Sequence, residues 1–529
     1  MQGTAFGHRL ETLNDGLNTF ANGERIPMPL IATDVHVQVL AGAALVTTMR
    51  RFRNAEQVPI EAIMTFPVGF DAVATGLAAT INGRRMVGVA QEKAEARETY
   101  EAALDEGRMS VLHEEALRGI HILSVGALPS GAEVCVELEQ VVPLTEVSGK
   151  QFLRLPMTAG QLYGNSPLLP ADDLVTAASD SHEATLQVTV ELGHVYLDGA
   201  MLPQGEQVGI PLNRSLEMVI EGGSFGLLTG RAADGRAVSL SFRPTHGHDA
   251  SLDLHVLVDR SGSTQSHVGR AEVSIWQAIR DGLSDVLRVI RPSDQISLWQ
   301  FDSACQFLGT ARGEACAKLT NKLQLPEGGT ELAVAVHAAI AAEAKDILVL
   351  TDGQTWAHIV EDLKSEAVRI SAILVGSGSL DANVGHLCAL TGGQVFYAPD
   401  QDVSSPLKSA LEALRTPGDA SKGQMGETGP EHVVALRGGI TIEANWTADQ
   451  NLNGPFSADA VGRFAAALAI PILGAEQTQA WACAHGLCTH ATSLILVDEV
   501  SQPTEGFSQM RKVPLMQVGG GAAAGKPTP

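Results

Sequence analysis

Five polar residues in three short segments of this chain offer oxygen ligands for a hard cation. They are Asp259, Ser261, Ser263, Thr330 and Asp352. Two of the segments come directly after apolar runs, at 252–258 and 346–350. Carboxylate and hydroxyl oxygens suit Mg²⁺, and Mn²⁺ accepts a similar set. The residue types and their order therefore predict a divalent-metal site, with Mg²⁺ as the expected ion and Mn²⁺ as a possible substitute.

Each segment also has an ordinary structural explanation, because Asp and Ser cap helices and form turns. Under that alternative the three segments are unrelated polar turns, and Asp259 is a helix cap. The metal hypothesis makes a further chemical prediction. Neutral hydroxyls leave an ion most of its charge, and carboxylates behind them orient the ligands. Such a site stays electrophilic and can accept an acidic group from outside.

The segments Asp259–Ser263, Gly328–Thr330 and Leu348–Gly353 resemble the metal-ion-dependent adhesion site of von Willebrand factor type A domains. The resemblance implies that the hydroxyls touch the metal and that the carboxylates act mostly through water. It also implies one coordination position for an Asp or Glu of a partner protein. Thr330 is expected to join or leave the ion as its loop moves.

The region from about 250 to 415 is expected to position these residues. Its strand-like runs are 252–259, 295–302, 346–351, 370–375 and 394–397, and its helical patterns include Glu272–Arg288 and Leu332–Ala344. Alternating strands and helices predict a doubly wound, mostly parallel α/β sheet that is covered on both faces. Asp259 and Asp352 then stand at carboxyl ends of strands, where ligands bind in open α/β sheets.

The N-terminal part of the chain is predicted to be β-rich, because polar and apolar residues alternate in it, as at 34–39 and 134–138. One helix of strong helix formers, Gln91–Ala103, interrupts the strands. The order of several short pieces resembles the vault protein inter-alpha-trypsin (VIT) domain. These pieces are Pro67, Ile81–Arg84, Glu92, Ala96, Tyr100, Val125–Gly126 and Pro129–Gly131. They offer no nucleophile–base pair and no cluster of metal ligands.

The expected architecture is a multidomain one, with a β-rich VIT-like part and a Rossmann-like α/β domain of the von Willebrand A type. We expect the VIT-like domain at 20–148, a second small β unit at 150–247 and the α/β domain at 250–415. A C-terminal α+β region is expected at 431–515, followed by a flexible tail at 516–529. The resemblance as a whole is to proteins like the inter-alpha-trypsin inhibitor heavy chains, with a bacterial source expected.

Cys483, His485, Cys488 and His490 offer four soft ligands within one short stretch, as a structural Zn²⁺ site requires. Their spacing is unusual, because Cys483 and Cys488 point apart if the stretch is helical. Buried thiols and surface histidines are the favoured interpretation. Whether these residues bind zinc stays open at this stage.

Two glycine-rich segments imitate nucleotide-binding motifs. Gly520–Lys526 matches part of a phosphate-binding loop, but Pro527 replaces the required Ser or Thr. Gly376–Asp381 follows a strand-like run and lacks the third glycine of a dinucleotide fingerprint, so a tight strand-to-helix turn is favoured. Neither segment predicts a nucleotide site.

The composition of the chain indicates which partners and which cellular compartment to expect. The chain carries 60 acidic and 36 basic residues, for a formal net charge of −24, which argues against binding to a phosphate backbone. Its six cysteines are too sparse for a disulfide framework. The start of the sequence has no apolar core after a basic region, and no apolar run approaches the roughly 20 residues of a membrane helix. A cytoplasmic location without a membrane span is the expectation.

These patterns favour a non-enzymatic, adhesion-type interaction protein that binds an Asp or Glu of a protein partner through its metal site. The alternative is an accessory subunit of an AAA-type ATPase or of another Mg²⁺-dependent complex. Intrinsic hydrolase activity is disfavoured, because Ser261 has no evident general base. His255 and His267 are near Ser261 in sequence, and the period of the strand assigns His255 a buried structural role.

Overall fold

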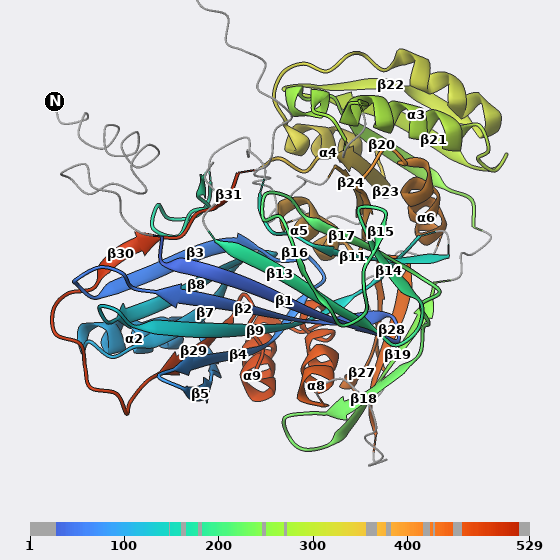
Figure 1. The fold of residues 1–529 in the computed structure, drawn as a ribbon. Coiled ribbons are helices and arrows are strands. Elements are labelled where there is room, and N and C mark those ends of the chain that lie inside the picture. The colour runs from blue at the N-terminus through green and yellow to red at the C-terminus, as the bar shows by residue number, and fades with distance from the viewer. Residues whose placement is uncertain are drawn as a thin grey trace, which may run out of the picture.

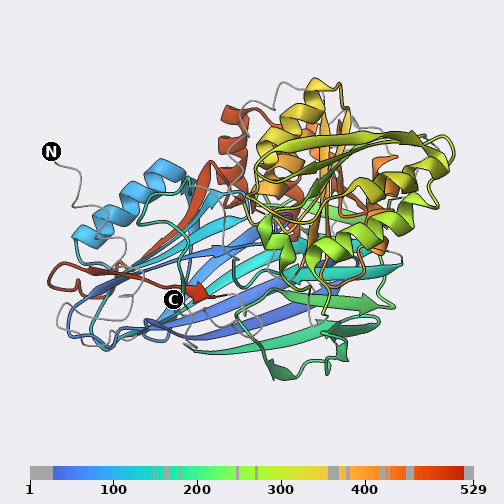
Figure 2. The same cartoon turned by 90° about the horizontal axis from the view of Figure 1, so that it is seen from above.

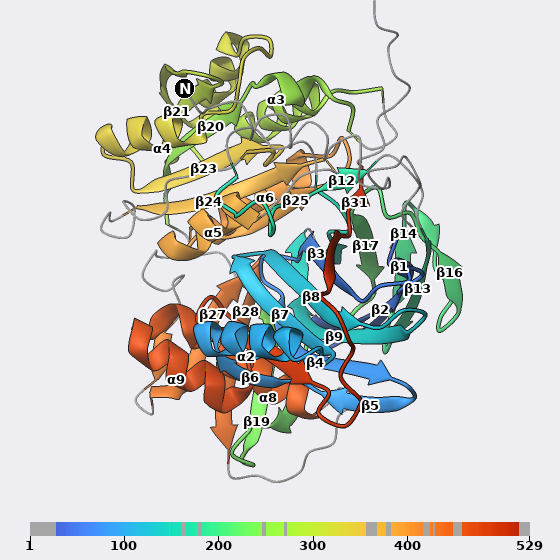
Figure 3. The ribbon, with the colours of Figure 1, turned by 90° about the vertical axis from the view of Figure 1, so that its left-hand side faces the viewer.

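The structure is a computed structural model, and it contains six sheets (Figure 1). The residues that it describes are 28–147, 149–159, 166–177, 182–245, 250–268, 272–355, 368–376, 382–415, 424–426, 429–447 and 458–517. The α/β domain lies above the other sheets in two perpendicular side views (Figures 1 and 3). No helix among the described residues is long and apolar enough to cross a membrane.

Two large sheets pack face to face and share one hydrophobic core. In sheet order, the seven-stranded sheet contains β16 (Gln207–Gly209), β13 (Glu183–Val190), β1 (Leu30–Leu40), β2 (Ala43–Arg53), β9 (Glu133–Pro143), β4 (Val73–Ile81) and β5 (Arg84–Val87). The six-stranded sheet contains β30 (Gln509–Lys512), β3 (Ile60–Pro67), β8 (Ile120–Leu128), β7 (Ser110–Leu117), β29 (Thr492–Val497) and β6 (Val89–Glu92). The helix α2 (Lys93–Asp105) packs on the second sheet, where Tyr100 meets Leu112 and Ile495.

The period-two pattern of the sequence explains which face of each strand is buried. In β1, Val35, Val37 and Val39 point into the core, and the residues between them are partly exposed. Burial of one apolar face is the main force that fixes strand register. The strands predicted at 34–39 and 134–138 and the helix predicted at Gln91–Ala103 are therefore confirmed, with small shifts at their ends.

Two smaller sheets and two helices complete the lower part. One sheet contains β10 (Thr145–Val147), β11 (Lys150–Leu155), β17 (Leu216–Glu221), β14 (His194–Leu197) and β15 (Ala200–Met201). The other contains β18 (Leu227–Arg231), β19 (Ala237–Pro244), β28 (Ile440–Thr447), β27 (Gly429–Arg437) and β26 (Gln424–Gly426), and it meets α8 (Ala458–Ala467), which packs on α9 (Ala475–His485). A short parallel pair joins β12 (Thr176–Ala177) to β31 (Leu515–Met516).

The sheets cross the boundaries predicted from the sequence. β13, from the predicted second unit, pairs in parallel with β1. β29 and β30, from the predicted C-terminal region, join the sheet of β3, β7 and β8. Long-range pairing of this kind cannot be read from local periodicity, because it joins strands hundreds of residues apart. The VIT-like part is thus built from several segments of the chain.

The α/β domain has the predicted doubly wound architecture. Its strands, in sheet order, are β22 (Cys305–Arg312), β21 (Gln295–Phe301), β20 (Asp253–Asp259), β23 (Asp346–Thr351), β24 (Arg369–Val375) and β25 (Val395–Ala398). All neighbouring pairs are parallel except β21 with the edge strand β22. One face is covered by α3 (Ile275–Leu287), α6 (Ser404–Leu414) and the 3₁₀ segment η2 (Gly313–Lys322), and the other by α4 (Leu332–Ala341) and α5 (Ala382–Thr391) (Figure 2).

Candidate metal centre

The two predicted metal aspartates stand where adjacent parallel strands end. Asp259 is the last residue of β20, and Asp352 directly follows β23. The two strands are neighbours, with Val258 opposite Leu350. The sheet order also reverses its direction between β20 and β23, and such a switch point leaves a crevice at the carboxyl ends of the strands. Topology therefore brings two carboxylates, 93 positions apart in the numbering, to one place.

Hydrogen bonds join three of the five predicted residues into one cluster. The backbone N–H of Ser261 donates to Asp259 Oδ1 at 2.8 Å. The hydroxyl oxygens of Ser261 and Ser263 are 3.0 Å apart. The charge of Asp352 raises the pKa of the buried Asp259 carboxyl, so these two carboxyls lie near each other. The segments that follow β20 and β23 therefore meet in the fold, and the choice between a metal site and polar turns stays open.

Thr330 reaches the same edge on a separate loop. The carbonyl of Gly328 accepts a hydrogen bond of 3.1 Å from the N–H of Gly262, and the carbonyl of Thr330 accepts one of 3.2 Å from the hydroxyl of Thr355. Gly328 adopts φ +74°, and a Cβ there would lie 3.0 Å from Ser303 Oγ. Glycine is thus required for this turn, which keeps Thr330 buried between the ends of β20 and β23.

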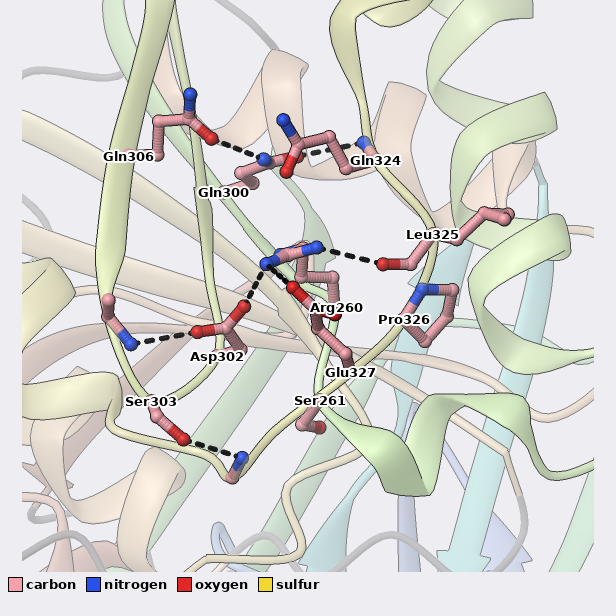
Figure 4. A network of polar contacts seen from close by, with 12 residues as sticks. Arg260, Ser261, Gln300, Asp302, Ser303, Gln306, Gln324, Leu325, Pro326 and Glu327 are labelled. Carbon is pink, nitrogen blue, oxygen red and sulfur yellow. Dashed lines mark hydrogen bonds and ion pairs between the residues drawn. The ribbon is translucent and has the colours of Figure 1, made fainter.

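Arg260 ties three loops together beside the cluster (Figure 4). Its guanidinium pairs with Asp302, which follows β21, and with Glu327, at 2.8 Å, on the Thr330 loop. It also donates to the carbonyl of Leu325 at 2.9 Å. The hydroxyl of Ser303 accepts the N–H of Gly329 at 2.8 Å, as Figure 4 shows. A charged network of this density holds the Thr330 loop in register with Ser261.

The cluster buries two acids without a positive partner among the described residues. Asp259 and Asp352 are both fully buried, and the described ion pairs include neither of them. Burial and, after it, the nearby Asp352 carboxylate raise the pKa of the Asp259 carboxyl to about 7. Burial also raises the pKa of Asp352. Like charges in a buried site oppose ionisation of both groups unless a cation compensates them.

The donor set fits a hard divalent cation. Asp352 Oδ2 is buried and has no hydrogen-bond partner in the described part of the chain. Two carboxylates, two serine hydroxyls and a threonine on an adjoining loop supply oxygen ligands only, which is the chemistry that Mg²⁺ and Mn²⁺ prefer. The structure thus brings all five predicted residues to one edge of the sheet. Their role as ligands stays a prediction.

Sequence reasoning missed Thr351. Its hydroxyl donates to Asp259 Oδ2 at 2.5 Å and accepts the N–H of Gly353 at 3.0 Å. Thr351 is 1% exposed and therefore fixes the Asp259 carboxylate from the side of β23. Its position directly before Asp352 was the available clue, since the last residue of a parallel strand faces the end of its neighbour.

The structure gives Ser261 no catalytic base among the histidines considered. His255 is buried, and its Nδ1 accepts the indole N–H of Trp299 at 3.2 Å, which confirms the predicted structural role. His267 is exposed and lies in an isolated bridge with Ser274. Neither histidine has a hydrogen bond to Ser261 in the described contacts.

The four residues considered for zinc do not converge. His485 packs against Trp481 and Trp446, and the thiol of Cys488 faces the carbonyl of His113 at 3.5 Å. A different grouping forms instead from His113, His121 and Cys488, whose ligand atoms lie within 4.8 Å of one another. His121 Nδ1 and His113 Nε2 are 2.9 Å apart and share a hydrogen bond. The spacing in the sequence could not show this, because β7, β8 and the segment after α9 meet only in the fold.

The glycine-rich tail and the segment at 377–381 lie outside the described residues. The tail motif Gly520–Lys526 and most of the predicted flexible tail at 516–529 fall there, as does all of Gly376–Asp381 except Gly376. Met516 and Gln517, at the start of the predicted tail, are described, and Met516 belongs to β31.

Comparison with known proteins supports the two resemblances. Residues 30–140 match the vault protein inter-alpha-trypsin domain. The chain is 24% identical over 457 residues to human von Willebrand factor A domain-containing protein 5A, which covers 74% of this chain and 57% of the relative. The mouse protein is 24% identical over 446 residues, with 72% and 55% covered. The chain therefore spans little more than half the length of these curated relatives.

A shorter match joins the chain to an enzyme. Mouse protein mono-ADP-ribosyltransferase PARP4 is 32% identical over 132 residues, which cover 25% of this chain and 7% of the relative. A match over so small a share of the relative carries no conclusion about its activity.

Solved structures also align with about a third of the chain. Proximal thread matrix protein 1 from the mussel byssus, with a zinc-occupied MIDAS motif, is 18% identical, covers 33% of this chain and 48% of its own, and has a TM-score of 0.26. Manganese-loaded TRAP protein of Plasmodium vivax is 19% identical, covers 33% and 77%, and has a TM-score of 0.23. The chain is thus similar to the vault protein inter-alpha-trypsin domain over residues 30–140 and, over most of its length, to von Willebrand factor A domain-containing protein 5A.

Proposed function

We propose that this chain, a VIT domain combined with a von Willebrand A-type domain, is a non-enzymatic protein-interaction protein. Mg²⁺, or Mn²⁺ in its place, binds Asp259, Ser261, Ser263, Thr330 and Asp352 and presents a coordination position to an Asp or Glu of a partner. The observation that carries the proposal is the pair of fully buried acids at the switch point of the sheet, with one carboxylate oxygen lacking any described partner.

The residues around the site favour binding of an acidic group over hydrolysis of a substrate. The described residues around Ser261 include no histidine placed as a base, and Thr351 already fixes the Asp259 carboxylate. A general base must reach the proton that it removes, by direct contact or through one water. An acidic group that completes the ligand set needs no such base, because it binds the cation directly. Binding therefore explains the geometry with fewer groups than hydrolysis requires.

The acidic composition is compatible with this mode of recognition. The chain has a net charge of −24, so an acidic partner is repelled over most of the surface. A bound cation makes one small area attractive against that background, which gives selectivity for a protruding Asp or Glu. We also propose a cytoplasmic location, in keeping with the free thiols of all six cysteines.

The experiment that tests the proposal is a crosslinking pull-down from the native cell with the full chain as bait. It compares wild type with Asp259→Ala, each in Mg²⁺ and in EDTA. Asp253→Ala is the matched control, because Asp253 begins the same strand and is exposed. We expect partners that are lost both in EDTA and in Asp259→Ala but kept in the control. Identical partner sets in all four conditions contradict the proposal, and recovery of an AAA-type ATPase would identify the partner.

A further inference from the structure

Arg50 occupies a position where the sequence pattern calls for an apolar residue. The inward-facing residues of β2 at this end are Val46, Thr48, Arg50 and Phe52, and Arg50 is 7% exposed. Its partner across the ladder is Thr33 on β1, which is also buried. The Arg50 side chain therefore extends into the space between the two large sheets.

The buried guanidinium has no acidic partner among the described residues. Its Nε and Nη1 atoms are buried and make no hydrogen bond there. The contact that it does make is with the ring of Phe66, with the guanidinium carbon 4.1 Å from the ring centroid. Such a cation–π contact contributes roughly 1–2 kcal/mol when it is desolvated, which does not compensate the burial of a full charge.

Three other buried arginines show how this protein normally handles such a charge. Each pairs with a carboxylate, as Arg154 does with Glu217 at 3.5 Å, Arg369 with Asp346 at 2.7 Å and Arg415 with Asp294 at 2.7 Å. Unpaired buried charges are expensive, so they are retained where a ligand completes them. Arg50 differs from these three arginines because it has no carboxylate partner among the described residues, and this difference indicates that an external anion pairs with it.

Arg50 lines a cavity that could hold the head of such an anion. The cavity measures about 30 Å³, and a single water needs about 10–15 Å³ on the same measure. Its lining residues are Thr33, Arg50, Met64, Phe66, Pro156, Met157, His182, Leu212, Pro514, Leu515 and Met516. The wall from Pro514 to Met516 belongs to the C-terminal segment that runs past β3 to pair with β12 (Figure 3).

The titratable neighbours are neutral near pH 7, so the cavity carries one positive charge. Burial and, after it, the charge of Arg50 lower the pKa of His182 to about 4 and that of His113 to about 3. The same charge disfavours a cation at His113, His121 and Cys488, because the Phe66 ring that Arg50 contacts also stacks with His113, with 6.3 Å between the ring centroids. A monoanion balances the site, whereas a phosphate dianion overcharges it.

A second hollow continues from the first and shares His182, Leu212 and Met516 with it. It measures about 530 Å³, and its further lining residues are the apolar Ala184, Ile210 and Pro211, Gly209, and the polar Glu183 and Thr185. Ligand pockets typically combine a mostly apolar lining with a few fixed polar groups. A small cavity with one positive charge opens toward a larger hollow whose lining is partly apolar, and this combination fits an amphiphile.

We propose that this pocket binds a small monocarboxylate with an apolar body, such as a medium-chain fatty acid. The carboxylate accepts hydrogen bonds from Arg50, and the chain extends past Met516 and Leu212 into the larger hollow. Planar carboxylate and guanidinium groups match in a bidentate pair, which suits the cramped inner cavity. This pocket lies between the two large sheets, whereas the metal centre lies in the α/β domain. The proposal is independent of the proposed interaction function.

The test is calorimetric titration of the full chain with octanoate, and with 1-octanol as the uncharged probe of equal length. The variants are Arg50→Met and the matched control Arg51→Met, whose side chain is 49% exposed on the opposite face of the same strand. We expect octanoate to bind wild type and Arg51→Met equally, Arg50→Met at least tenfold more weakly, and octanol more weakly than octanoate. Equal binding of octanoate by Arg50→Met, or no binding by wild type, overturns the proposal.

A second measurement does not depend on the variant folding. Octanoate labelled with ¹³C at the carboxyl is titrated from pH 7 to pH 4 while bound to wild type. We expect the bound carboxyl to remain ionised below the pKa of free octanoate, because the Arg50 charge stabilises the anion. A bound carboxyl that takes up its proton at or above the pKa of free octanoate overturns the assignment of Arg50 as its partner.

Discussion

The metal centre and the Arg50 pocket bury charge of opposite sign without compensating it. At the end of β20, two acids come together and no described basic group pairs with either. In the middle of β2, one guanidinium enters the core and no described acid pairs with it. Both arrangements make folding less favourable, because an isolated charge loses its hydration on burial. Each place is thus shaped for a ligand of the opposite charge.

The two places differ in how the fold reaches them. The acids stand at the carboxyl ends of adjacent strands, where ligands bind in open α/β sheets. Arg50 stands inside a sandwich, where side chains of two sheets and a C-terminal segment surround it. An edge site suits a partner protein, and an enclosed site suits a small molecule. The position of each site relative to its sheet therefore indicates the kind of ligand, a partner protein at the edge and a small molecule between the sheets.

Asp259→Asn should give the largest effect on metal binding. We expect affinity for Mn²⁺, measured by calorimetry, to fall about 100-fold, as it does when groups that support a metal site are lost. The thermal midpoint of the metal-free protein should stay equal or rise, because the change removes one of two like charges in a buried site. A variant that binds Mn²⁺ as wild type does, or that loses stability without metal, would make Asp259 a purely structural residue.

Asp294→Asn tests whether a buried arginine destabilises this protein when its carboxylate partner is removed. Asp294 makes two hydrogen bonds to Arg415, at 3.0 and 2.7 Å, and is fully buried. Removal of one partner of a buried ion pair leaves an uncompensated charge, so we expect a loss of about 3 kcal/mol in the free energy of unfolding. Urea unfolding followed by tryptophan fluorescence measures it.

The control for that prediction is Asp285→Asn, whose pair with Arg288 is more than 60% exposed on both sides. An exposed pair contributes at most about 1 kcal/mol, so this variant should unfold close to wild type. Similar losses in the free energy of unfolding in both variants would show that a buried arginine needs no acidic partner in this protein. The lack of such a partner at Arg50 would then no longer indicate an external anion.

Removal of metal should reverse the pH dependence of stability. The folded pKa of Asp259 is about 7 and its ordinary value is 3.8, so the metal-free folded state binds more protons than the unfolded state between these values. Its stability should therefore fall as pH rises from about 4 to about 7. Metal binding requires the ionised acids, so Mg²⁺ should stabilise the protein more at pH 8 than at pH 5.

Thermal midpoints at four pH values, in EDTA and in excess Mg²⁺, test this prediction. We expect the two curves to separate as pH rises. Parallel curves would mean that the buried acids do not hold the ion, whatever the pull-down shows.

Arg260→Ala should give the smallest effect. It frees the Thr330 loop from Asp302 and Glu327 without touching the ligands themselves. We expect about threefold weaker Mn²⁺ binding, which is the order of effect for a partly exposed charge network. Arg288→Ala, an exposed change on the same domain, is the control and should leave affinity unchanged. A loss as large as that of Asp259→Asn would show that loop position dominates the site.

Local chemistry made much of the α/β domain predictable. The predicted runs at 252–259 and 346–351 appear as β20 and β23, because continuous apolar residues followed by polar ones define a buried parallel strand and its end. The five candidate ligands follow from the resemblance to the adhesion-type metal site together with these strand ends, and the structure brings them to one edge of the sheet. Thr351 escaped notice, since its hydroxyl matters only once β23 lies beside β20.

The sequence by itself determined the order of strands and helices, the residue types at the strand ends and the acidic surface, since these follow from local periodicity and composition. The tertiary structure decided which distant segments meet. It placed β29 and β30 in the six-stranded sheet with β3, β7 and β8, brought Cys488 to His113 and His121, and left Arg50 buried without an acid among the described residues. Those outcomes depend on long-range pairing, which is selected by burial of whole faces and leaves little trace in neighbouring residues.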